Sequence, residues 1–343
     1  MKLAAFLIVL AVSLITTPGA APGQPGFGER AIRAYVCNFG GDGVSVIDPA
    51  AGALVAHVKT GAKPHGVGIG PSGREVYVTN EGDGTLSFID AASSTVTHTL
   101  PVGKSPHQLA VSVDGKHIFV PLNSDNAVAV VDAAARNVIK TVPVGRAPHI
   151  VEPSADGTRL FVTCEGDMKV VEMDAKTFEV AGEIPIYGVP RVPALSADGK
   201  TLYQSIRWLN GALVIDTAKR KAVNRVALGE VKFAEDGKDA HGLALTADGA
   251  ALWITTQTTD TVTIVSTSDL SIAGTIAVGR DPNWIAFTPP DHSRPLAVVS
   301  NTGSNDATII DAESRKVAAT IKVGPSPKRL AVGWVEAVQS EAK

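Results

Sequence analysis

The chain has 343 residues, a formal net charge of −3 and a pI near 6.2, and no block of like charge interrupts it. Aromatic residues make up only 5% of the composition, so the basic stripe and stacking platforms typical of nucleic-acid binding are missing. The sequence therefore gives little support to a nucleic-acid partner.

The first 21 residues are predicted to be a secretory signal peptide. Lys2 precedes an apolar run over residues 3–15, and small residues follow over 17–21. A retained membrane anchor is the alternative, but the apolar run is shorter than the roughly 20 residues that a bilayer span needs. We expect a periplasmic or secreted protein with no membrane span in the mature chain, preceded by a flexible Gly/Pro-rich lead-in over residues 22–30.

From residue 31 to residue 334 the chain repeats one unit. Its clearest copy, residues 102–145, contains four short β-rich runs separated by three turns. A period of about 42 residues with four strands is typical of a propeller blade. The residue that ends the third run marks seven copies: Asp48, Asp90, Asp132, Asp174, Asp216, Ser266 and Asp311. We therefore predict an all-β, seven-bladed propeller with four antiparallel strands in each blade.

The two ends of the repeat region are complementary. The first copy begins with its second strand, near residues 34–36, and the last copy ends with a surplus strand over Lys328–Trp334. This surplus strand should complete the first blade and close the ring, because a closed ring leaves no free strand edges. Residues 335–343 are predicted to be a tail, and the closed ring is expected to be a monomer.

The two cysteines occupy equivalent places in different blades. Cys37 ends the second strand of the first blade, and Cys164 ends the same strand of the fourth. These blades lie nearly opposite each other in a ring of seven, so their Cα atoms should be farther apart than the roughly 7 Å that a disulfide allows. We predict two free, buried thiols.

Residues Tyr77–Asn80 read Tyr-Val-Thr-Asn, and variants stand at residues 35–38 and 161–164. Over residues 31–334 the chain resembles the YVTN-repeat β-propeller family, which includes periplasmic and surface-layer proteins and is related to the haem d1 propeller of nitrite reductases. The resemblance also extends to seven-bladed lactonases and lyases. It implies the propeller fold but does not specify one activity.

One position of the repeat gathers residues able to bind a ligand. Three copies start with a Gly-x-x-Pro-His pattern, ending at His65, His107 and His149, and the other four carry degenerate forms of it. The first strand of a propeller blade lines the central channel. The residues that follow the proline, here called the mouth residues, should therefore ring one mouth of that channel. They are Lys328, His65, His107, His149, Arg191, His241 and Asn283.

Three interpretations of the mouth residues stay open. The repeat itself can fix the histidines, each bonding a carbonyl of the neighbouring blade. Alternatively, His65, His107 and His149 can bind a divalent metal ion, since imidazole is a common ligand. Finally, Arg191 can anchor an anion through its two-pronged guanidinium, with Lys328 as a second cation and the histidines as helpers at lower pH.

Two irregular segments flank the predicted fifth blade. An insertion over Glu230–Lys238 should overhang the mouth beside Arg191, and the loop over Ile206–Leu209 exposes Trp208 as a candidate contact. Most Asp-Gly and Asn-Gly pairs of the repeat are predicted to be turns. A binding site is therefore expected near the fourth to sixth blades.

No nucleophile elbow, phosphate-binding loop or paired metal-ligand motif is present in the sequence. We therefore expect a non-catalytic propeller that binds a small anionic molecule or a protein partner at the channel mouth, without a cofactor. Two alternatives remain. One is a hydrolase or lyase of the lactonase type, implied by the resemblance, and the other is a carrier of a metal ion or tetrapyrrole that uses the histidines.

Overall fold

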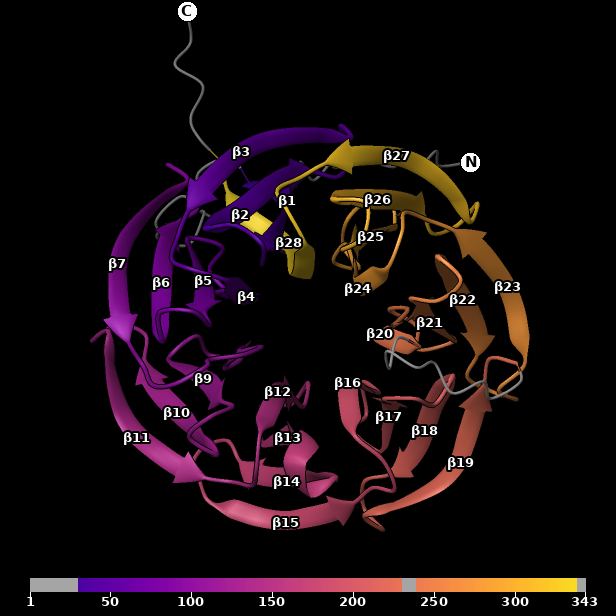
Figure 1. Cartoon of the computed structure of the whole chain (residues 1–343), viewed down its shortest axis with the longest axis horizontal. Coiled ribbons are helices and arrows are strands. Elements are labelled where there is room, and N and C mark those ends of the chain that lie inside the picture. Colours follow the sequence, from indigo (N-terminus) through magenta and orange to yellow (C-terminus); the bar gives the residue numbers. More distant parts are fainter. Residues whose placement is uncertain (1–29, 230–238, 338–343) are drawn as a thin grey trace, which may run out of the picture.

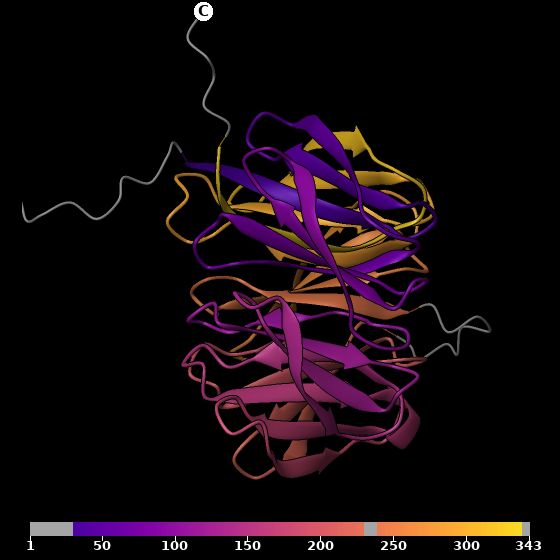
Figure 2. The same ribbon diagram turned by 90° about the vertical axis from the view of Figure 1, so that its left-hand side faces the viewer.

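The computed structural model describes residues 30–229 and 239–337, which form seven four-stranded antiparallel sheets around a central channel (Figure 1). Each sheet is one blade, and the predicted seven-bladed fold is confirmed. Figure 2 shows the ring edge-on, with the strands tilted across its thickness. The helical part of the described chain is a single 3-10 turn, η1 (Glu165–Asp167), and no helix among these residues has the length and hydropathy needed to cross a membrane.

The first blade combines the two ends of the described chain. Its strands, from the channel outward, are β28 (Pro327–Glu336), β1 (Arg30–Asn38), β2 (Gly43–Asp48) and β3 (Ala53–Lys59). Blades 2 to 4 follow in chain order, each again from the channel outward. Blade 2 contains β4 (Pro64–Ile69), β5 (Glu75–Asn80), β6 (Thr85–Asp90) and β7 (Thr95–Pro101). Blade 3 contains β8 (Ala110–Val111), β9 (His117–Leu122), β10 (Ala127–Asp132) and β11 (Asn137–Pro143). Blade 4 contains β12 (Pro148–Pro153), β13 (Arg159–Cys164), β14 (Lys169–Asp174) and β15 (Val180–Pro185).

Blades 5 to 7 complete the ring with the same order of strands. Blade 5 contains β16 (Pro190–Leu195), β17 (Thr201–Ile206), β18 (Gly211–Asp216) and β19 (Lys221–Ala227). Blade 6 contains β20 (Ala240–Leu245), β21 (Ala251–Thr256), β22 (Thr261–Ser266) and β23 (Ile272–Ala277). Blade 7 contains β24 (Pro282–Phe287), β25 (Leu296–Asn301), β26 (Asp306–Asp311) and β27 (Lys316–Lys322).

Closure of the ring follows the predicted scheme. Strand β28 pairs antiparallel with β1, with Ile32 opposite Trp334 and Val36 opposite Leu330, so the C-terminal strand is the inner strand of blade 1 (Figure 1). The strand continues two residues past the predicted limit, to Glu336. Val335 explains the extension, because it is buried in the apolar layer between blades 1 and 2.

The hydrophobic core lies between the blades rather than at one centre. The buried apolar residues of the described chain form seven clusters, and each combines residues from adjacent blades. Val, Ile and Ala predominate because the facing sheets leave room for β-branched and small side chains. Each layer is small, so a chain of this length needs no oversized single core.

The Tyr-Val-Thr-Asn motif fixes the start of the inner strand. The pairing of β4 with β5 shifts register between Pro64 and Gly66, which takes His65 out of the ladder. Thr79 holds this bulge, since its Oγ1 accepts from the Gly66 N–H at 2.8 Å and donates to the carbonyl of His107 in the next blade at 2.8 Å. The equivalent hydroxyls of four other blades accept from the same backbone position: Thr163, Ser205, Thr255 and Ser300.

Blade 3 departs from this scheme because Pro121 replaces the hydroxyl residue. Its inner strand, β8, is reduced to two residues. Gln108 compensates, since its side chain donates to the Val67 carbonyl at 2.9 Å and its backbone N–H donates to the His149 carbonyl at 3.1 Å. Gln108 thus joins the inner strands of blades 2, 3 and 4, and it draws their mouth residues together.

Both cysteines are buried and free, as predicted. Burial raises the pKa of both thiols, to about 12 for Cys164. We therefore expect the native protein not to react with a disulfide reagent at pH 8, because the reactive thiolate is almost absent. The denatured, unreduced protein should show two thiols per chain, and finding none would contradict the arrangement of the blades.

Candidate functional site at the channel mouth

The structure brings six of the seven mouth residues into one cavity of about 250 Å³. These are His65, His149, Arg191, His241, Asn283 and Lys328. His107 is absent from the lining but packs beside it, with its ring centroid 4.3 Å from that of His65 and 4.9 Å from that of His149. The sequence-predicted ring is therefore a compact cluster rather than seven separate groups.

Of the two irregular segments, the loop over residues 206–209 contributes to the cavity lining. Trp208 is 37% exposed and lies outside the cavity lining, whereas the neighbouring Arg207 contributes to that lining and stacks on the Trp208 ring at 4.7 Å. The insertion over residues 230–238 lies outside the described residues. In this loop, Arg207 is therefore a better candidate for ligand contact than Trp208.

Sequence reasoning missed four residues of the cavity lining, namely Gln257, Asp281, Thr302 and Arg329, of which Arg329 is the most unusual. It is 1% exposed, its Nη2 donates to Nε2 of His149 at 2.7 Å, and its Nη1 donates to Oδ1 of Asn283 at 3.2 Å. Its guanidinium also lies 4.6 Å from the ring of Trp284. Among the described residues, no carboxylate lies within ion-pair distance of it. A buried cation of this kind is unusual, because such charges are normally paired.

A faint signal for Arg329 was present in the sequence. It stands one residue after the mouth position, where the other blades carry no charge. The equivalent residues are Gly66, Gln108, Ile150, Val192, Gly242 and Trp284.

Arg191 has a different environment from the one predicted. Its Nη1 donates to Oε1 of Glu165 at 2.7 Å, so part of its charge is already compensated. The same carboxylate oxygen lies 3.1 Å from Nδ1 of His149. The two arginines and His149 therefore share one chain of polar contacts, Arg191–Glu165–His149–Arg329, in which a neutral His149 accepts from Arg329.

The remaining histidines have separate partners. Nδ1 of His65 and Nε2 of His107 lie 3.6 and 3.4 Å from Oε2 of Glu81. Nδ1 of His241 lies 2.7 Å from the carbonyl oxygen of Asn283, a contact to the neighbouring blade like the one proposed for the repeat. In addition, His65, His107 and His149 offer ligand atoms that all lie within 4.8 Å of one another, as a metal site would require.

Cationic side chains outnumber carboxylates in the cavity lining, which contains Arg191, Arg207, Lys328 and Arg329 but also Asp281. Burial, followed by neighbouring positive charge, lowers the pKa of Lys328 to about 8 and that of Arg329 to about 9. Burial also lowers the pKa of His65, His149 and His241 well below the usual value, and the charge of Arg329 adds to this effect. A bound negative charge would relieve each of these penalties.

No protein-family model and no curated protein matches the chain. Solved structures do match. A periplasmic gluconolactonase of Pseudomonas aeruginosa superposes with a TM-score of 0.69 at 21% identity, covering 89% of this chain and 99% of that one. Hydrazine synthase of Kuenenia stuttgartiensis gives 0.72 at 19% identity, covering 86% and 99%. The dihydro-heme d1 dehydrogenase NirN gives 0.60 at 17% identity, covering 87% and 74%.

At these identities the likeness shows the fold alone. The chain is thus a seven-bladed propeller of the same architecture as a lactonase and a haem d1 protein, as the sequence resemblance implied. Membership of the YVTN-repeat family itself stays a prediction.

Proposed function

We propose that the protein binds a small carboxylate or phosphate anion in the mouth cavity, with Arg329 as the main anchor. The observation that carries this proposal is a buried guanidinium whose hydrogen bonds, within the described part of the chain, go to the neutral groups of His149 and Asn283. An unpaired buried charge costs several kcal/mol. An anion in the cavity would offset that cost through charge-assisted hydrogen bonds.

The other lining residues suit the same ligand. Lys328 supplies a second cation, and Arg207 a third on the blade 5 side. Because Oδ1 of Asn283 accepts from Arg329, its amide N–H groups are left to donate. Because Arg191 is paired with Glu165, its main role would be to hold Glu165 and His149 in position rather than to bind the anion. A volume of about 250 Å³ is below the usual range for drug-sized ligands and favours a small anion.

The signal-like residues 1–21 support a site of action outside the cytoplasm. They lie outside the described residues, so export stays a prediction. The gluconolactonase neighbour supports the same location, since its name describes it as periplasmic.

The test is a thermal-shift screen followed by calorimetry with citrate, gluconate and inorganic phosphate. At least one anion should stabilise the wild type, and Arg329→Gln should weaken its binding ten- to a hundred-fold, since a charge-assisted hydrogen bond contributes about 1.5–3 kcal/mol. Arg159→Gln is the matched control. Arg159 is a half-buried arginine outside the mouth cavity, where it contacts Glu172 and the Gly199 turn, so this variant should bind like wild type.

Two results would replace the proposal. Stabilisation by Zn²⁺ or Cu²⁺ alone, undiminished in Arg329→Gln, would assign the site to a metal on His65, His107 and His149. At present Arg329 opposes that assignment, because it places a cation on Nε2 of His149. Turnover of gluconolactone that is lost in Arg329→Gln would assign a lactonase activity instead.

Anion binding should also depend on pH. His65, His149 and His241 are neutral at pH 7 in the free protein, because their pKa values lie well below the usual 6.5. A bound anion raises those pKa values, so binding takes up protons and should tighten as pH falls from about 7.5 to 6. Calorimetry in two buffers of different ionisation enthalpy measures the proton uptake directly. Zero uptake would contradict the role of the histidines.

A further inference from the structure

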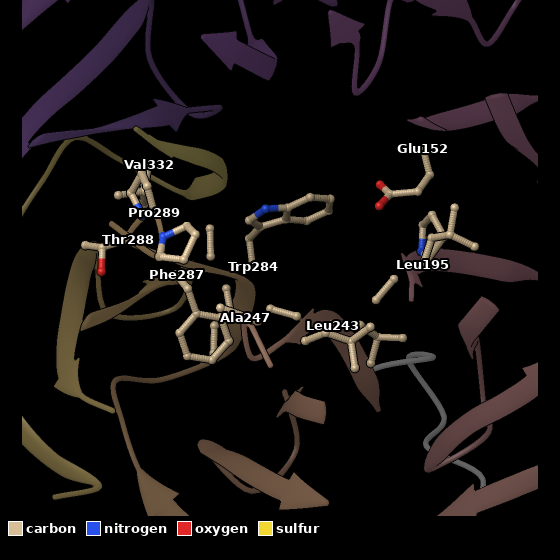
Figure 3. Close-up of a pocket in the computed structure, with 16 residues that line it drawn as sticks. Glu152, Leu195, Leu243, Ala247, Trp284, Phe287, Thr288, Pro289 and Val332 are labelled. Atoms are coloured by element: carbon tan, nitrogen blue, oxygen red, sulfur yellow. The ribbon is translucent and has the colours of Figure 1, made fainter. Parts of the chain in front are cut away.

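The far end of the channel holds a second cavity, of about 420 Å³ (Figure 3). Its wall comes from the ends of inner strands β12, β16, β20, β24 and β28, opposite the mouth residues with which those strands begin. Most of the wall is apolar, including Leu195, Leu243, Phe287 and Val332. A volume of this size lies within the range of small-molecule sites.

Glu152 is the one ionisable residue among the sixteen that line this cavity. It is half-buried, and no basic side chain of the described residues lies within ion-pair distance of its carboxylate. Burial raises the pKa of Glu152 to about 7. A carboxyl group in an apolar wall without a cationic partner is costly to keep as an anion, and a cationic ligand would reverse that cost.

Trp284 faces Glu152 across the cavity. In Figure 3 the indole ring and the carboxylate project into the space from opposite walls. Arg329 of the mouth cavity stacks on the same indole at 4.6 Å, so Trp284 lies between the two cavities. Indole is the aromatic side chain with the strongest attraction for cations. A ligand beside Trp284 and Glu152 would meet two groups that favour positive charge.

Three turns at this end of the channel each carry an aspartate. The turns that follow β12, β16 and β20 contain Asp156, Asp198 and Asp248, whose pKa values are lowered by hydrogen bonds from nearby hydroxyl and backbone groups. Lys200 lies 3.5 Å from Asp198, whereas no basic side chain of the described residues lies within ion-pair distance of Asp156 or Asp248. Fixed negative charges around a cavity raise the local concentration of cations.

We propose that this cavity is a second binding site, for an apolar organic amine whose ammonium group pairs with Glu152 and contacts the face of Trp284. The hydrocarbon part would lie against the leucines and Phe287. The site differs from the mouth site in the side chains that would contact the ligand and in the charge of that ligand, and Arg329 and Trp284 are in contact between the two cavities.

The test uses 2-phenylethylamine as the probe and calorimetry as the measurement. The amine should bind wild type, and 2-phenylethanol, which keeps the shape and loses the charge, should bind at least tenfold more weakly. Glu152→Gln should reduce the affinity for the amine at least tenfold and leave that for the alcohol unchanged. The control is Glu183→Gln. Glu183 lies on outer strand β15 and pairs with Lys169 of β14, far from the cavity, so this variant should behave as wild type.

The pH dependence gives a second, mutation-free measurement. Glu152 loses its proton as pH rises from 6 to 8, while the amine stays protonated, so amine affinity should increase over this range. This direction is opposite to the one expected for anions at the mouth, so failure of one proposal is distinguishable from failure of the other. Equal affinities of amine and alcohol, or a flat pH profile, would overturn the amine site and indicate a purely apolar cavity.

Discussion

A chain shortened to end at Gly324 should not fold. The missing segment contains all of β28, which is the inner strand of blade 1 and pairs with β1 along eight residues. It also removes Leu330 and Val335, which are 2% and 1% exposed. Each such side chain contributes about 1.5–3 kcal/mol through burial, and the whole stability of a domain is about 5–15 kcal/mol. The unpaired edge of β1 would in addition favour aggregation.

Circular dichroism with thermal melting, together with size-exclusion chromatography, measures this effect. A matched control that ends after Ala337 keeps β28 complete and should melt as the full chain does. If the shorter chain melted cooperatively within a few degrees of the full one, closure by β28 would not be what holds the ring.

The architecture could be predicted because each blade is specified locally. The aspartate that ends the third strand shows this, since Asp48 and Asp311 accept hydrogen bonds from the backbone N–H groups three residues later, at 2.9 and 2.8 Å. Thr79 shows it again, because one hydroxyl joins the second strand, the inner strand and the next blade. The same contacts form in each blade that carries the same residue. The number of times the residue occurs in the repeat therefore predicts the number of blades.

The candidate site could be predicted only in part, because its chemistry departs from the repeat. The mouth position predicted six residues of one cavity. The bulge at the start of six of the seven inner strands also directs the following residue, and at that position Arg329 is the only charged residue. The pairing of Arg191 with Glu165 joins two blades, and no local pattern indicates it. The compact His65–His107–His149 cluster likewise depends on Gln108 and Pro121, which are exceptions to the repeat.

Replacing Arg329 by methionine should stabilise the protein in the absence of a ligand. Burial, with Arg191 nearby, lowers the pKa of Arg329 from 12.5 to about 9, so folding at pH 7 works against the charged form. Substitution of buried charges by apolar side chains of similar volume often stabilises by about 1–4 kcal/mol. Methionine can keep the packing on Trp284 while removing the charge. We expect a Tm several degrees higher, with anion binding lost.

Denaturant unfolding of wild type and variant from pH 7 to pH 10 decides the matter. The advantage of Arg329→Met should be present at pH 7, where the buried guanidinium is charged, and it should not grow as pH rises. Arg191→Met is the matched control with the opposite expected sign, since it deprives the half-buried Glu165 of its arginine partner. Loss of stability in Arg329→Met at every pH would instead make Arg329 a structural residue, held by His149 and Asn283 for the sake of the fold.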